Sequence, residues 1–283
     1  MDPLTLATAA DANLVTHFTW VQKQTPGMRV VETAELVLTH GGMPCDTFNA
    51  ACRARLPDAT APPRIREAIA WFDRAGGPFS WWVGIEDQPS DLRARLVDAG
   101  LELAESEVAM AADLDRVAAA DLMPSGLVVR RVGSAAELEA FAALAAANWS
   151  PPDQHVVQFY RRAAPLILGP DSIFWFYLGF LGEIPVATAQ LTVGGGVVGL
   201  YNISTAAGYR RRGFGTALTA KPLVDARSAG FMTAILQAAP EGVGLYRRLG
   251  FVEFGEIAEY KRSLGAGGSR PGSGGLPPAP TTG

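Results

Sequence analysis

The sequence predicts an α/β fold, in which a mixed sheet carries helices on its faces. In the second half of the chain, runs with the 3.6-residue period of a helix alternate with runs of β-branched and aromatic residues. Glycine-rich turns separate these runs. Because 48% of the 283 residues are hydrophobic, the chain can bury substantial cores, and its length suits two domains of ordinary size.

Changes in composition divide the chain into three parts. A break at residues 122–126 separates an N-terminal domain at residues 1–122 from a second domain at residues 126–264. Residues 265–283 are almost all Gly, Pro, Ser, Thr and Ala, which cannot bury enough apolar surface to offset the entropy of ordering. We expect this last segment to be a disordered tail.

Two helices are expected near the start of the second domain. A β-branched run begins this domain at Leu127. The sequence SAAE after it is a capping box that begins at Ser134, and apolar residues from Leu138 onward recur with helical spacing. This pattern predicts a helix at residues 134–148. A second helical pattern occupies residues 153–168.

The remainder of the second domain is predicted to form a meander of strands, followed by alternating helices and strands. Aromatic and β-branched residues favour strands at residues 172–181, 186–193 and 197–205, and glycine turns join them into an antiparallel meander. The pattern then predicts a helix at residues 213–229, a strand at 232–237, a helix at 242–249 and a strand at 251–262.

The turn between the third of these strands and the next helix has the composition of an anion site. It contains Arg210, Arg211 and Arg212, followed by Gly213 and Gly215. Glycines let a ligand approach the backbone, and the unpaired N–H groups and dipole at a helix start attract negative charge, so a diphosphate fits. A P-loop is absent, and the dinucleotide-binding GxGxxG pattern fails at its third glycine. A solvated basic turn is the structural alternative.

Two motifs resemble those of the GNAT N-acetyltransferase superfamily. Residues 205–218 fit TxAxxRxxGxGxxL, which contains the R/Q-x-x-G-x-G/A pattern of the family's motif A. Residues 245–251 read LYRRLGF, which is similar to the family's LYxxxGF. The two motifs occur in the family's order, joined by a helix and a strand. The resemblance implies the GNAT acyl-CoA N-acyltransferase fold and acetyl-CoA as co-substrate.

The resemblance also implies a role for each matching position. Backbone N–H groups of residues 211–216 hold the diphosphate of coenzyme A, and the backbone of Ile203 and Thr205 meets the pantetheine where two strands splay apart. One of these N–H groups also stabilises the oxyanion of acyl transfer. The implied cofactor-binding residues are Ile203, Thr205, Arg210, Arg211, Arg212, Gly213, Phe214, Gly215 and Thr216.

The implied catalytic residue is Tyr246. It matches the tyrosine that protonates the departing thiolate in many members of the family. A thiol with a pKa near about 8.5 and a phenol near about 10 are close enough to share a proton in the transition state. The alternative is a tyrosine that only packs its ring under the coenzyme.

Some positions depart from the family pattern. Ala239 stands where many members have an asparagine, and Pro222 lies inside the motif A helix, where we expect a kink or a local irregularity. The strand at residues 197–205 has no carboxylate to act as general base. The candidates for that role are Asn202, Glu241, Asp153 and, through a water molecule, His155.

The N-terminal domain repeats part of this pattern. Residues 79–84, 89–100 and 101–114 read as strand, helix and strand, which echoes the end of a GNAT domain without its tyrosine. We therefore expect two GNAT-like domains in tandem, with a degenerate first copy that has lost coenzyme binding. Trp81 and Trp82 alternate along the first of these strands, so only one of them faces the core.

The function predicted from the motifs is N-acetyl transfer, by direct attack of a small-molecule or peptide amine on acetyl-CoA. No Ser–His or Cys–His pattern suggests a covalent intermediate. The alternative is a catalytically decayed acyl-CoA-binding regulatory or interaction module. A monomer or a homodimer is expected.

Composition excludes several other classes of protein. A net charge of −4 and a pI near 5.5 argue against a nucleic-acid partner. The longest apolar run, residues 173–181, is shorter than the about 20 residues that cross a bilayer, so no membrane partner is expected. Cys45 and Cys52 suggest buried reduced thiols and no metal site, and without a basic leader we expect a cytoplasmic protein.

Overall fold

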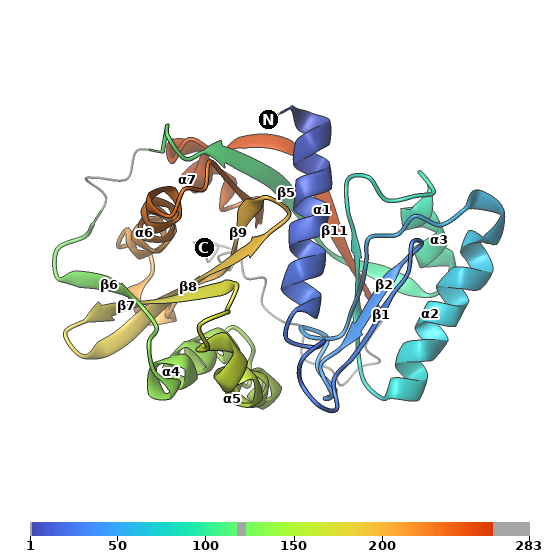
Figure 1. Cartoon of the computed structure of the whole chain (residues 1–283), viewed down its shortest axis with the longest axis horizontal. Coiled ribbons are helices and arrows are strands. Elements are labelled where there is room, and N and C mark those ends of the chain that lie inside the picture. Colours follow the sequence, from blue (N-terminus) through green and yellow to red (C-terminus); the bar gives the residue numbers. More distant parts are fainter. Residues whose placement is uncertain (1, 118–122, 263–283) are drawn as a thin grey trace, which may run out of the picture.

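A single mixed sheet dominates the computed structural model, which describes residues 2–117 and 123–262 (Figure 1). Its 11 strands run in the order β1-β2-β3-β4-β11-β5-β10-β9-β8-β7-β6. The strands are β1 (Arg29–Glu32), β2 (Val37–His40), β3 (Ala50–Cys52), β4 (Ser80–Val83), β5 (Leu101–Asp113), β6 (Leu127–Arg131), β7 (Phe174–Leu181), β8 (Ile184–Gly194), β9 (Val197–Thr205), β10 (Thr233–Ala238) and β11 (Val252–Arg262). The helices are α1 (Pro3–Thr19), α2 (Ala61–Ala75), α3 (Leu92–Asp98), α4 (Ala135–Ala146), α5 (Gln154–Ile167), α6 (Phe214–Ser228) and α7 (Val243–Arg248).

The expected elements of both halves are confirmed, with ends that differ by a few residues. Ser134 caps α4 by accepting a hydrogen bond from the Glu137 N–H at 3.3 Å, while the Glu137 carboxylate accepts one from the Gly133 N–H at 2.8 Å. Helix α6 continues through Pro222, which is buried within it. Trp81 is fully buried, whereas Trp82 on the opposite face of β4 is only partly covered.

The two halves of the chain repeat one order of elements. β1, β2 and β3 form an antiparallel meander, α2 crosses over, and β4 lies parallel to β3. β7, β8 and β9 form the second meander, α6 crosses over, and β10 lies parallel to β9. A short helix and a final strand follow in each half, α3 with β5 and α7 with β11. This repeat of elements agrees with the tandem arrangement expected from the sequence.

The final strands of the two halves are exchanged. β5, from the N-terminal half, pairs antiparallel with β10, and β11, from the C-terminal half, pairs antiparallel with β4. β5 and β11 pair with each other at the middle of the sheet. Each half is therefore completed by a strand of the other. The expected domain boundary partly overlaps residues 118–122, which lie outside the described residues. The expected tail at residues 265–283 lies outside them as well. The division into domains therefore stays a prediction.

Helix α1 connects the halves on one face of the sheet (Figure 1). It packs against β8 and β9 of the C-terminal half. The Asn13 side chain donates to the carbonyls of Thr192 and Gly194 at 3.0 Å each, and it accepts a hydrogen bond from the Tyr201 hydroxyl at 2.8 Å. Because these backbone carbonyls belong to the β8–β9 hairpin, the first helix of the chain fixes the position of the meander in the second half.

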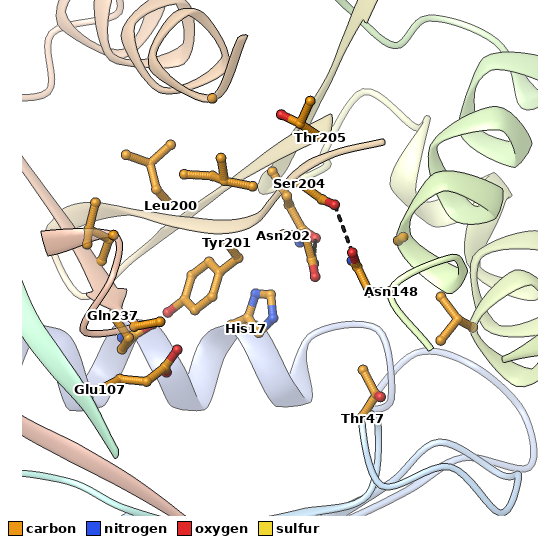
Figure 2. A pocket seen from close by; sticks show the side chains of 18 of the residues that line it. His17, Thr47, Glu107, Asn148, Leu200, Tyr201, Asn202, Ser204, Thr205 and Gln237 are labelled. Atoms are coloured by element: carbon orange, nitrogen blue, oxygen red, sulfur yellow. Dashed lines mark hydrogen bonds between the residues drawn. The ribbon is translucent and has the colours of Figure 1, made fainter. Parts of the chain in front are cut away.

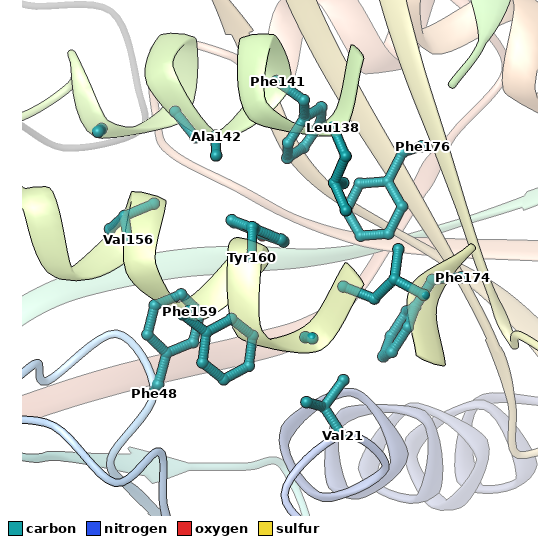
Figure 3. Close-up of a cluster of buried hydrophobic side chains, with 14 of the residues drawn as sticks. Val21, Phe48, Leu138, Phe141, Ala142, Val156, Phe159, Tyr160, Phe174 and Phe176 are labelled. Carbon is teal, nitrogen blue, oxygen red and sulfur yellow. The ribbon is translucent and has the colours of Figure 1, made fainter. Parts of the chain in front are cut away.

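An aromatic core also joins the halves. Phe48, in the loop before β3, stacks on Phe159 of α5 with ring centres 3.6 Å apart, and Phe141 of α4 packs edge-on against Tyr160 (Figure 3). Val21 and Met43 of the N-terminal half belong to the same cluster.

Three smaller observations concern the sequence-based expectations. Cys45 and Cys52 are both buried and free. Among the described helices, none has the length and hydropathy that crossing a bilayer requires. Within the same residues, no group of three His, Cys, Asp or Glu side chains is arranged to hold a metal ion.

Candidate active site

β9 and β10 separate partway along their length. They pair in parallel only from Val198 to Leu200, although β9 continues to Thr205 and β10 to Ala238. The register of β9 against β8 shifts in the same region, and Asn202 there has a φ of 51°. This irregularity turns β9 away from β10, so the backbone of Ile203 and Thr205 is not paired with β10.

Helix α6 begins at a glycine in the left-handed conformation. Gly213 is its N-cap with φ 80°, a value that glycine tolerates better than other residues, and Arg211 before it has φ 60°. Gly213 has no side chain that could cap the helix, so the N–H groups of the first turn stay available to an anion. A Cβ added at Gly215 would have no neighbour closer than 3.8 Å, which shows that space lies beside this turn.

One cavity, of about 590 Å³, joins the splayed strands to the α6 turn and extends between the two halves. All of the residues predicted to bind coenzyme A, together with Tyr246, line this cavity, except Arg212. The guanidinium of Arg212 instead lies over the rings of Tyr209 and Phe214, at 5.7 and 5.2 Å from their centres. Arg210 supports the turn, because its Nε donates to the Thr205 carbonyl at 3.0 Å.

The charged residues of the cavity are separated by sign. Arg210, Arg211 and Arg248 line it around the α6 turn and α7, while Glu105, Glu107 and Glu259 line it on β5 and β11. Lys261 is the cation among the carboxylates, and it is held by Glu259 at 3.2 Å and by Asp46 at 3.0 Å. One end of the cavity therefore suits phosphate groups, and the other suits a cation.

Tyr246 lies between these two ends. It projects from α7 into the cavity, and its ring packs edge-on against Phe251 with centres 5.9 Å apart. Burial, followed by the nearby negative charge of Glu107, raises the pKa of Tyr246 to about 12. The hydroxyl therefore keeps its proton at neutral pH and can donate it.

The side chains that the sequence suggested as general bases are poorly placed for that role. Asn202 lines the cavity, but it is an amide whose Nδ2 donates to Gln190 at 2.7 Å and to the Tyr160 hydroxyl at 3.3 Å. Asp153 caps α5, where it accepts from the N–H of His155 at 2.8 Å. Asp153, His155 and Glu241 are not among the residues that line the cavity.

Sequence reasoning missed a carboxylate that does line the cavity. Glu107, on β5 of the N-terminal half, lies near Tyr201 and Gln237 (Figure 2). Burial, followed by the charges of Glu105 and Glu259, raises the pKa of Glu107 to about 8. The signal available in the sequence was a pair of glutamates, Glu105 and Glu107, on one face of an otherwise apolar strand end.

Comparison with known proteins agrees with the motifs. Residues 138–251 match the model of the acetyltransferase (GNAT) family. None of the curated proteins compared with the chain matches it.

Several solved structures share the fold over most of the chain. A GCN5-related N-acetyltransferase from Kribbella flavida is 22% identical, with a TM-score of 0.68 over 90% of this chain and 96% of that one. A conserved protein of unknown function from Staphylococcus epidermidis is 11% identical, with a TM-score of 0.61 over 86% and 97% of the two chains. A tandem GNAT protein from the clavulanic acid biosynthesis pathway is 12% identical, with a TM-score of 0.55 over 84% and 83%. Residues 138–251 therefore carry the GNAT-family match, and the similarity to these solved structures shows a shared fold over most of the chain.

Proposed function

We propose that the protein is an N-acetyltransferase that moves the acetyl group of acetyl-CoA to an amine by direct attack. The observation that carries this proposal is the single cavity that joins a glycine-capped helix start, two splayed strands and Tyr246. The positive and negative ends of the cavity support the same assignment, since the donor is an anion and a protonated amine is a cation.

In this proposal the backbone of the C-terminal half holds the donor. The N–H groups of residues 211–216 bind the diphosphate, and Arg210 and Arg211 add positive charge beside it. The backbone of Ile203 and Thr205 meets the pantetheine in the gap between β9 and β10, and a backbone N–H there stabilises the oxyanion.

Tyr246 acts as the acid. The amine nitrogen forms a bond to the carbonyl carbon, the carbon–sulfur bond breaks, and the Tyr246 hydroxyl gives its proton to the leaving thiolate. Its raised pKa, about 12, keeps the Tyr246 hydroxyl protonated at neutral pH, so that a proton is present when the thiolate leaves. The acceptor is a small-molecule or peptide amine, and we place the reaction in the cytoplasm on the basis of the donor.

The test combines binding and turnover. Titration calorimetry with acetyl-CoA and with coenzyme A measures binding, and a thiol reagent follows the release of free coenzyme A over a panel of amines. Amine-dependent thiol release supports the enzyme. Binding of acetyl-CoA without release on any amine would instead support the decayed module, and the lack of a carboxylate on β9 is the feature that favours that alternative.

A further inference from the structure

Glu107 reaches the cavity because of the exchange of strands. Val108 pairs with Ala238, the last residue of β10, so Glu107 is the first residue of β5 beyond that strand. On its other side it pairs with Ile257 of β11. The splayed end of β9 lies across the same opening. The carboxylate thus lies where β10 ends and the cavity begins, near Tyr246 of the C-terminal half.

The Glu107 side chain is half-buried at the cavity wall, and its carboxylate has no partner within the described parts of the chain. No hydrogen bond or ion pair to it occurs there, although Glu259 is paired with Lys261 and Tyr201 with Asn13. Its charge nevertheless acts on the hydroxyls of both Tyr246 and Tyr201. A carboxylate that lines a cavity among other negative charges, without a cation of its own, would be stabilised by a cationic ligand at this point.

We propose, building on the proposed acetyl transfer, that Glu107 is the base that takes a proton from the ammonium group of the acceptor, and that the acceptor is a primary amine on an apolar body. The N-terminal half would then contribute a catalytic residue to the active site.

The proton balance of this step is complete. Glu107 removes one proton from the ammonium group and later releases it to solvent. The free amine attacks the thioester carbonyl carbon, forming the carbon–nitrogen bond. As the carbon–sulfur bond breaks, the thiolate takes the Tyr246 proton, and the second proton lost by nitrogen restores the tyrosine. The products are the amide, free coenzyme A and one proton in solution.

The electrostatic surroundings suit this role. The titratable and charged groups that line the cavity on the elements around Glu107 are Glu105 on the same strand, Glu259 and Lys261 on β11, Tyr201 on β9, Tyr246 and Arg248 on α7, and His17 on α1. Burial, followed by the negative neighbours, holds the pKa of Glu107 near 8. This value is much closer to the pKa of an alkyl ammonium, about 10.4, than the pKa of an ordinary carboxylate is. A base whose pKa approaches that of its substrate and the working pH transfers protons efficiently.

The walls beyond the carboxylates define the body of the acceptor. Trp82, Phe18, Tyr201 and Phe174 line this part of the cavity. An aromatic or aliphatic body can pack against these rings while its ammonium meets Glu107. A carboxylate on the acceptor would be repelled by Glu105 and Glu107. Phenethylamine should therefore be accepted at least about 10-fold better in kcat/KM than phenylalanine, which differs from it by one carboxylate.

The decisive variant is Glu107→Gln, measured with phenethylamine and acetyl-CoA. We expect kcat to fall by about 10²- to 10⁴-fold, while the Kd for acetyl-CoA stays unchanged. In the wild type, kcat should rise with pH up to about 8, the pKa of Glu107. In the variant, the rise should move towards the amine's own pKa, about 10. Glu107→Asp should restore part of the activity, and Glu183→Gln, in the exposed β7–β8 turn, is the matched control.

The outcomes separate this inference from the proposed function. If the folded Glu107→Gln variant keeps the wild-type kcat, and its kcat still rises with pH up to about 8, Glu107 is not the base, although the proposed acetyl transfer stands. Phenylalanine performing as well as phenethylamine overturns the acceptor class. If wild-type protein binds acetyl-CoA but releases no thiol with any amine, the proposed function fails and this inference with it. Thermal melting checks that each variant is folded.

Discussion

Burial and, after it, the charge of Glu107 raise the pKa of the Tyr246 hydroxyl, although Glu107 and Tyr246 belong to different halves of the chain. Their proximity results from the insertion of β5 between β10 and β11. In the proposed mechanism the base and the acid must be held in fixed positions around the thioester, and Glu107 is held by the pairing of β5 with β10 and β11 of the other half. The exchanged strands therefore couple the fold of the whole chain to the candidate active site.

The first prediction concerns the acid. Tyr246→Phe removes the hydroxyl but keeps the ring that packs on Phe251. Turnover should fall by about 10²-fold, while the affinity for acetyl-CoA, measured by calorimetry, should hardly change. Tyr177→Phe is the control, because the Tyr177 hydroxyl donates to Asp225 at 3.0 Å outside the cavity. That variant should lose about 1 kcal/mol of stability and no turnover. Wild-type turnover in Tyr246→Phe would remove the acid role.

A second prediction uses the start of α6. Gly215→Asp places a carboxylate in the first turn of α6. Its interaction with the helix dipole stabilises the helix by about 0.3 to 1 kcal/mol, but the carboxylate repels a diphosphate. The Kd for acetyl-CoA should weaken by about 10-fold or more, while the melting temperature is unchanged or raised. Gly215→Ala is the neutral control, since its Cβ would have no neighbour closer than 3.8 Å. Equal affinity of the two variants would contradict a diphosphate at this turn.

The local parts of the fold and site could be predicted from the sequence. The start of α6 at Gly213 and the helix α7 follow from glycine positions and apolar spacing within a few turns of chain, and the resemblance to the GNAT motif is what singles out Tyr246 on α7. The same reasoning located the last strand–helix–strand unit of the N-terminal half. Such features depend on residues that are neighbours in the sequence, so a single sequence contains the information.

The exchange of strands could not be predicted in this way. The residues around Glu107 in the sequence do not show which strands will lie beside it, because β10 and β11 come from the far end of the chain. On the strand before the α6 turn, the sequence offers only Asn202 as a candidate base. In the structure the Asn202 side chain donates a hydrogen bond to Gln190. The contact of Asn13 with the β8–β9 hairpin is equally non-local. Pairings of this kind are set by the tertiary fold.

A third prediction follows from the buried carboxylates. Burial, followed by the charges of Glu105 and Glu259, raises the pKa of Glu107 to about 8, and burial, against the opposing charge of Lys261, raises that of Glu259 to about 7, both from the ordinary 4.5. Between the ordinary pKa of 4.5 and these raised values, the folded state binds more protons than the unfolded state. The free energy of unfolding therefore falls as pH rises through this range. Burial lowers the pKa of His17 to about 3, which acts in the opposite direction only below about 6.5.

We therefore expect the melting temperature without acetyl-CoA to fall between about pH 6.5 and 8. Glu107→Gln should flatten part of this decline, whereas Glu183→Gln should leave it unchanged because Glu183 is exposed. Scanning calorimetry across this range measures both. A melting temperature that stays constant or rises in the wild type would show that these carboxylates are charged in the folded protein.

The last prediction addresses the core that joins the halves. Phe48 is 7% exposed and stacks on Phe159, so Phe48→Ala removes a large side chain from the contact between the N-terminal half and α5. The free energy of unfolding should fall by about 3 to 5 kcal/mol in urea, against less than about 0.5 kcal/mol for Val128→Ala, whose side chain is 58% exposed. Because the halves share one sheet and exchange strands, unfolding should remain a single transition. Two separate transitions would show that the halves fold independently despite the exchange.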